Sequence, residues 1–178
     1  MRFLSGLLAT GLLTGLTLAA DGKFTLTGEN TKVEFTGTKP EGKHDGGFKK
    51  VVGAVTLTGT DPATTRIEVT IDTNSLWSDD PKLTGHLKSP DFFDVKTNPN
   101  SKFVSSKVEK DGANYKVTGE LTLNGKKKEI SFPATITTAG GALKLDSEFK
   151  INKGDFGMNY GKGKISDDVT IKVKVDAK

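Results

Sequence analysis

Apolar and polar side chains alternate along most of the chain from residue 24 onwards, with a period of two. Ile67, Val69 and Ile71, for example, alternate with Glu68 and Thr70. The same alternation runs through residues 115–123, 130–137, 143–151 and 169–176. A period of two is typical of β-strands that bury one face and expose the other to water, which favours an antiparallel sheet.

The connections between these strands are short. Residues 110–114, 124–125 and 139–141 predict hairpin turns, because their Asn and Gly residues tolerate the positive φ angles of tight turns. Pro133 has no N–H to donate to a ladder and therefore predicts an edge, a bend or a bulge. Less regular strands are expected at residues 24–27, 32–39, 48–58, 66–73 and 103–109.

Residues 76–95 interrupt the alternation. The sequence DDP at 79–81 predicts a helix start, with an acidic cap followed by Pro in the first turn. Leu83 and Leu87 are spaced to share one helical face. A second short turn is expected to begin at residues 89–91. We therefore predict a short helix or helix pair inserted into a meander.

About eight strands joined mostly by short turns predict an all-β domain that is either a sandwich or an up-and-down barrel. The alternation does not decide between the two. A barrel of this size has an interior that is filled by side chains or holds one small ligand.

Residues 1–20 are a different kind of sequence, with Arg2 as the single charge before an apolar run that ends in small residues. This order is typical of a secretory signal peptide, with cleavage after Ala19 or Ala20. The alternative is an N-terminal membrane anchor, for which the run is short and weakened by Gly and Thr. We predict a mature domain of residues 21–178 that is periplasmic or secreted, without a stable membrane anchor.

The composition is poor in reactive groups. The 178 residues include no Cys and two His, and the net charge is +4. The absence of Cys excludes disulfides, thiol nucleophiles and Cys-based metal sites. A small net charge without a basic stripe gives no reason to expect nucleic-acid binding. Neither G-x-S-x-G nor a phosphate-binding loop occurs. We therefore expect a binding protein rather than an enzyme, with no cofactor.

His44 and His86 are the main candidates for polar chemistry. His44 lies in the Gly-rich stretch 40–47, which is expected to be a loop, and His86 lies in the helical insert. The two could share a site with a carboxylate, but no motif makes them meet, and a structural role is the simpler interpretation. The nearby acidic residues do not follow the calcium-loop spacing and are interpreted as caps, so no metal site is expected.

Aromatic residues gather in the insert. Phe92 and Phe93 cannot both point the same way from a regular strand, and Trp77 lies close before them. In a helical cap they could plug one end of a β core or line an apolar channel. Core and pocket walls have the same composition, so the sequence leaves both interpretations open.

The chain resembles the YceI-like family of exported bacterial proteins. The resemblance rests on LTGHLKSPDFFDV at 83–95, on YKVTGELTLNG at 115–125, and on FKIN and DFGM at 149–152 and 155–158. Many members carry Arg-Asp before the His-Leu pair, where this chain has Thr84 and Gly85. The resemblance implies a lipocalin-like antiparallel barrel whose tunnel holds a polyisoprenoid, such as an isoprenoid quinone or a polyprenyl phosphate.

From this resemblance we predict a carrier or storage protein for a long apolar lipid, with a homodimer as a possible assembly. The alternatives are an enzyme that uses His86 as acid or base on an isoprenoid, and a structural β-domain with a filled core. The polar end of the ligand is expected at His86, with Asp91 or His44 nearby. The residues expected to line the tunnel are Leu87, Phe92, Phe93, Phe103, Phe132 and Phe149.

Overall fold

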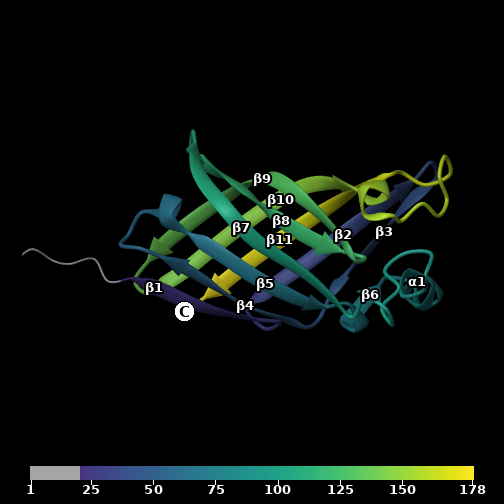
Figure 1. Ribbon diagram of the computed structural model, residues 1–178, viewed down its shortest axis with the longest axis horizontal. Helices are drawn as coiled ribbons and strands as arrows, with labels where there is room; N and C mark the ends of the chain where they lie inside the picture. Colours follow the sequence, from purple (N-terminus) through teal and green to yellow (C-terminus); the bar gives the residue numbers. More distant parts are fainter. Residues whose placement is uncertain (1–20) are drawn as a thin grey trace, which may run out of the picture.

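The computed structural model describes residues 21–178, in which antiparallel strands predominate (Figure 1). The predicted signal peptide, residues 1–20, lies outside the described residues. Among residues 21–178 no helix has the length and apolar character needed to cross a membrane. The strands are β1 (Gly22–Thr27), β2 (Thr31–Lys39), β3 (Gly42–Phe48), β4 (Val51–Leu57), β5 (Arg66–Asp72), β6 (Leu76–Ser78), β7 (Asn100–Asp111), β8 (Asn114–Leu123), β9 (Lys126–Ala139), β10 (Ala142–Asn152) and β11 (Asp168–Ala177).

The strands form one sheet that curls into a barrel. Its order is β1-β4-β5-β7-β8-β9-β10-β11-β2-β3-β6. β1 pairs with β4 while β2, the next segment of the chain, pairs with β3, so β1 and β2 act as one bent strand against β3 and β4. β5 and β6 continue each other in the same way. The pairing of β11 with β2 completes the circuit.

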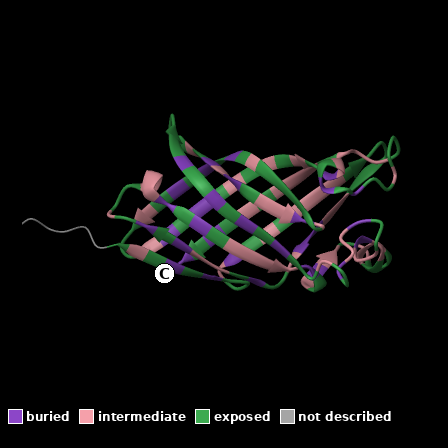
Figure 2. Cartoon of the chain, viewed as in Figure 1, coloured by how far each residue is buried: buried purple, intermediate pink, exposed green. Residues whose placement is uncertain are grey.

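These eleven segments therefore make up the predicted barrel of about eight strands, since three pairs of segments are bent single strands. The choice of barrel over sandwich comes from the β11–β2 pairing, which joins strands far apart in the sequence. Side chains alternate between buried and exposed along the strands, as the sequence predicted (Figure 2).

The predicted hairpin turns are present. Asn124 and Gly125 connect β8 to β9 with φ angles of 47° and 69°, and Gly140 and Gly141 connect β9 to β10 with φ angles of 59° and 77°. Positive φ at both turn positions matches the twist of the flanking strands, which explains the Asn-Gly and Gly-Gly pairs.

Pro133 marks the place where β9 separates from β10, as predicted for a bend. The β9–β10 register runs from the Ala139–Ala142 pair to the Thr135–Asp146 pair. Before Thr135, β9 pairs with β8 alone, while the rest of β10 pairs with β11. The Ser147 hydroxyl donates to the Pro133 carbonyl at this point. The barrel wall is therefore split between the first half of β9 and the second half of β10.

The prediction of a loop at residues 40–47 is wrong, because β3 occupies most of it. The glycines that suggested a loop are needed for close packing. A Cβ at Gly46 would lie 2.4 Å from the Phe35 ring and 2.6 Å from the Trp77 carbonyl oxygen. Glycine here allows the ring and the neighbouring strand β6 to approach the backbone.

The helical insert is confirmed. The helix α1 (Pro81–Leu87) begins after Asp80, whose carboxylate accepts a hydrogen bond from the Leu83 N–H at 2.8 Å. A series of turns follows instead of a second helix, with the Phe92 N–H donating to the Ser89 carbonyl. These turns direct Phe92 and Phe93 toward the barrel end.

Candidate functional site

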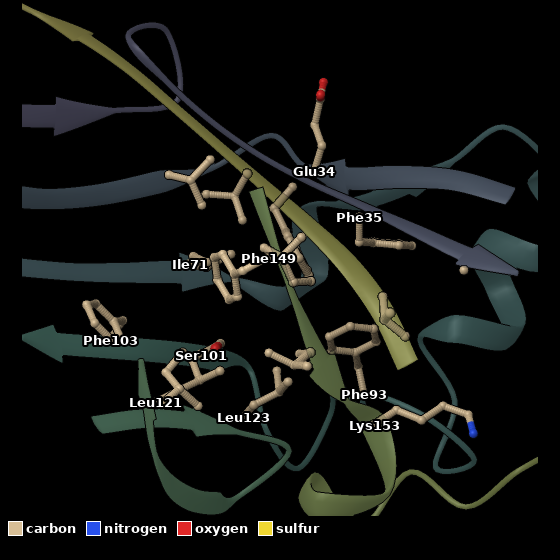
Figure 3. Close-up of a pocket in the computed structure, with 18 of the residues that line it drawn as sticks. Glu34, Phe35, Ile71, Phe93, Ser101, Phe103, Leu121, Leu123, Phe149 and Lys153 are labelled. Atoms are coloured by element: carbon tan, nitrogen blue, oxygen red, sulfur yellow. The ribbon is translucent and has the colours of Figure 1, made fainter. Parts of the chain in front are cut away.

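A cavity of about 260 Å³ lies inside the barrel and is lined mainly by apolar side chains from the inward faces of the strands (Figure 3). We call it the tunnel. Its lining residues come from β1 to β5, from β7 to β11, from α1 with the turns that follow it, and from the segment between β10 and β11. The alternation of the sequence is the cause, since every second residue of each strand faces inward.

Three phenylalanines form the middle of the tunnel wall. The rings of Phe132 and Phe149 stack with centroids 4.4 Å apart and planes inclined by 10°. The ring of Phe103, on β7, is tilted against that of Phe132, with centroids 5.4 Å apart. Phe132 is on β9 and Phe149 on β10, beyond the point where the two strands stop pairing. Aromatic contact thus replaces hydrogen bonding across the split in the wall.

One end of the tunnel is closed by packed side chains. Phe24, Leu57, Val117 and Leu143 belong to the main hydrophobic cluster but do not line the tunnel. Val117 and Leu143 are completely buried. The barrel is therefore filled at the end near the C-terminus and hollow toward α1.

A second aromatic cluster lies at the α1 end. Phe93 packs edge-on against Phe48 at 5.6 Å and lies 6.4 Å from Phe35, measured between ring centroids. Leu87 and Phe92 are buried beside it and also line the tunnel. Both interpretations of the aromatic insert therefore apply in part, because these side chains cap the barrel end and also form the tunnel wall.

His44, on β3, lines the tunnel. Its Nδ1 is 2.9 Å from a carboxylate oxygen of Asp79. The Asp45 backbone N–H and the His44 ring both bond to this carboxylate, and these bonds lower the pKa of Asp79. The bond to Asp79 orients the imidazole and leaves Nε2 for another partner.

His86 forms a different pair. Its Nε2 is 2.8 Å from the Asp91 carboxylate, and neither residue lines the tunnel. The His86 ring lies edge-on against Phe92 and Tyr160, at 5.1 Å and 4.5 Å. Each histidine thus has its own carboxylate. Among residues 21–178, no three His, Asp or Glu side chains are grouped so that they could hold a metal ion.

Lys153 lines the tunnel and was not singled out by the sequence. It is only 4% exposed and lies in the 3-10 turn η3 (Lys153–Phe156) that follows β10. Its ammonium donates to the Asp167 carboxylate, and this bond lowers the pKa of Asp167. Its surroundings in the sequence, Asn and Gly, are those of a surface turn, so no local pattern signals burial.

The structure brings together most of the residues proposed from the sequence. Leu87, Phe92, Phe93, Phe103, Phe132, Phe149 and His44 all line the tunnel, whereas His86 and Asp91 do not. The apolar residues that were not named, such as Ile71, Leu121 and Leu123, lie on inward faces that the alternation had marked. The alternation could have found them, but it does not distinguish tunnel wall from filled core.

The family model and the relatives found by comparison with known proteins all point to the same family. The model of the YceI-like domain matches residues 14–177. A UPF0312 protein of Serratia proteamaculans is 33% identical over 96% of this chain and 94% of its own length. Protein YceI of Escherichia coli is 32% identical over 74% of this chain and 72% of its own length.

Solved structures share the fold. BcnA of Burkholderia cenocepacia has a TM-score of 0.75 and 29% identity, covering 83% of this chain and 96% of that one. A polyisoprenoid binding domain from Saccharophagus degradans, implicated in plant cell wall breakdown, has a TM-score of 0.68 and 14% identity. It covers 91% of this chain and 99% of that one. At this identity the second likeness concerns the fold alone.

Proposed function

Because the chain belongs to the YceI-like domain family, we propose that its tunnel holds a long polyisoprenoid lipid and that the protein is a carrier or store for it. The observation that carries this proposal is the apolar tunnel, closed at one end by packed side chains and bounded by aromatic rings along its length. The Saccharophagus degradans domain of the same fold is named for polyisoprenoid binding.

The energetics favour such a ligand. Burying one CH₂ group contributes about 0.8 kcal/mol, so ten groups contribute about 8 kcal/mol before ordering costs. Hydrogen-bonded ladders tie the wall strands to each other, with a bulge between Ser105 and Lys107 in the β7–β8 pair and the split between β9 and β10. A preformed cavity of this kind reduces the ordering cost of binding.

The predicted site residues have two kinds of role in this proposal. The apolar wall that contacts the isoprenoid chain is formed by Leu87, Phe93 and Phe132 together with the other lining phenylalanines. His44 lines the tunnel, unlike His86, and is therefore the histidine that can contact the ligand. His86 and Asp91 act indirectly, by holding Phe92 at the tunnel end through ring contact.

The proposal includes export to the periplasm or the outside of the cell, with residues 1–20 as a cleaved signal peptide. It describes binding rather than catalysis. An acid or base working on a lipid inside the tunnel must touch it, and the His86–Asp91 pair lies outside the tunnel wall. This placement supports a carrier over an enzyme that relies on His86.

The test is to purify the mature protein from its natural host, extract it with organic solvent and identify the extract by mass spectrometry. We expect a stoichiometric isoprenoid. Replacing Ile71, which lines the tunnel, by Trp is expected to abolish the bound lipid, whereas the matched variant Val52→Trp on the exposed face keeps it. An empty extract, with no uptake of added polyprenols or quinones, would contradict the proposal.

A further inference from the structure

Lys153 is an anomaly in the tunnel wall. Lysine is almost never buried without a partner, because removing an ammonium from water costs several kcal/mol. Of the other charged residues around the tunnel, Glu34 and Lys39 are exposed and His44 is half-buried. Lys153 is therefore the one charged side chain among the lining residues of the described part of the chain that is held out of water.

Its position is fixed from two sides. The Lys153 backbone N–H donates to the Asp167 carbonyl at 2.8 Å, and its ammonium donates to the carboxylate of the same residue. The Asn152 side chain caps the turn by accepting from the Gly154 N–H. An ammonium has three N–H donors, and within residues 21–178 the Asp167 bond accounts for one. Two donors remain for a ligand.

A second hydrogen-bonding group, the hydroxyl of Ser166, belongs to the residue before Asp167. Ser166 lines the tunnel, and its hydroxyl oxygen accepts a bond from the Asp168 N–H at 3.1 Å, which leaves its own O–H to donate. Figure 3 shows Phe93 and Lys153 in the same part of the lining, with the Lys153 ammonium pointing away from the apolar side chains. The apolar lining thus includes a small group of hydrogen-bond donors at Lys153 and Ser166.

We propose that Lys153, with Asp167 and Ser166, binds the polar end of the lipid and selects an uncharged oxygen acceptor, such as a carbonyl or hydroxyl group. This inference rests on the proposed function. The carboxylate of Asp167 already neutralises the ammonium, so the group has no net charge to offer a phosphate. A phosphate placed there also meets the Asp167 carboxylate and loses its own hydration.

The experiment compares three C20 isoprenoids with the same chain: the hydrocarbon, geranylgeraniol and geranylgeranyl phosphate. Their equilibrium binding to the delipidated mature protein is measured with radiolabelled ligand. We expect the alcohol to bind at least tenfold more tightly than the hydrocarbon, and at least as tightly as the phosphate. Lys153→Met keeps the aliphatic stem and removes the donors, so it is expected to weaken the alcohol about tenfold and leave the hydrocarbon unchanged.

The matched control is Lys150→Met, on the exposed face of β10, which is expected to change none of the three affinities. Asp167→Asn is a second, independent variant, because it keeps Lys153 and removes the neutralising charge. It is expected to raise the affinity for the phosphate relative to the alcohol by about tenfold. This variant keeps the inference testable if Lys153→Met does not fold.

The outcomes separate the two proposals. If the hydrocarbon and the alcohol bind equally well and Lys153→Met changes neither, the polar site is refuted while the lipid carrier stands. If the phosphate binds more tightly than the alcohol, the preference for an uncharged group is refuted. If none of the three compounds binds, the proposed function itself fails.

Discussion

Phe132 offers the most direct test of the tunnel wall. Its ring is 7% exposed, stacks on Phe149 across the split between β9 and β10, and also contacts Phe103 on β7. The substitution Phe132→Ala removes this ring from the middle of the barrel and leaves the hydrogen bonds of β9 with β8 intact. Its effect therefore reports on packing at the tunnel wall.

The size of the effect follows from the packing. Replacing a buried Phe by Ala costs about 3–5 kcal/mol, and the lower end applies here because one side of the ring faces the tunnel. For a domain of this length, each kcal/mol corresponds to a Tm change of about 2–4 °C. We expect the delipidated variant to melt about 6–12 °C below the wild type.

Calorimetry or circular dichroism of the delipidated protein measures this change. The matched control is Val52→Ala, which removes a side chain that is 62% exposed and is expected to change stability by less than about 0.5 kcal/mol. A ligand present at a hundred times its Kd should then stabilise the wild type by about 2.7 kcal/mol. The variant should gain less, because it has lost part of the wall that contacts the chain.

Two results would refute this reasoning. If Phe132→Ala melts within about 2 °C of the wild type, the ring is not packed in the stack. If the variant is destabilised as expected but gains as much as the wild type from added lipid, Phe132 supports the barrel and does not contact the ligand.

Three further predictions follow from individual contacts. The pKa of Asp167 is lowered because its carboxylate accepts a hydrogen bond from the Lys153 ammonium. Its stabilising contribution is therefore present above the ordinary Asp pKa of about 4 and is lost as the pH falls through the lowered pKa. The Tm difference between the wild type and Asp167→Asn should be larger at pH 7 than at pH 2. Gly46→Ala forces a Cβ to 2.4 Å from the Phe35 ring and should lower the free energy of unfolding by about 1–3 kcal/mol in denaturant titration. Gly37→Ala is the control, because a Cβ there meets nothing within 4 Å and should cost far less. Asp80→Ala removes the cap of α1 and should lower the free energy of unfolding by about 1 kcal/mol in the same titration, without changing the far-UV spectrum of the strands. An unchanged free energy of unfolding would mean that the cap is not formed in solution.

Local features of the sequence predicted many of the elements well. The alternation of Ile67, Val69 and Ile71 marks their inward face, because side chains of a strand alternate between its two sides regardless of what the strand pairs with. The Asn124–Gly125 turn and the cap at Asp80 are equally local, since each depends on a few neighbouring residues. These features were recognisable before the fold was known.

Glycine misled the prediction at β3. Gly46 lies in a regular strand, and the position requires glycine because the Phe35 ring and the Trp77 carbonyl occupy the space that a side chain would need. Both neighbours come from other strands, so the reason for the glycine is not visible in the residues around it. The same applies to Lys153, which lines the tunnel and whose ammonium is paired with Asp167, a residue distant in the sequence.

The sequence by itself determined that this protein is an antiparallel β-domain with a helical insert, since periodicity, turns and caps are properties of short segments. Only the tertiary structure decided that β11 closes the barrel on β2, that Pro133 lies where β9 leaves β10, and that the interior is filled at one end and hollow at the other. Whether apolar side chains meet in a core or line a tunnel depends on the distance between opposite walls, and strand pairing far apart in the sequence sets that distance.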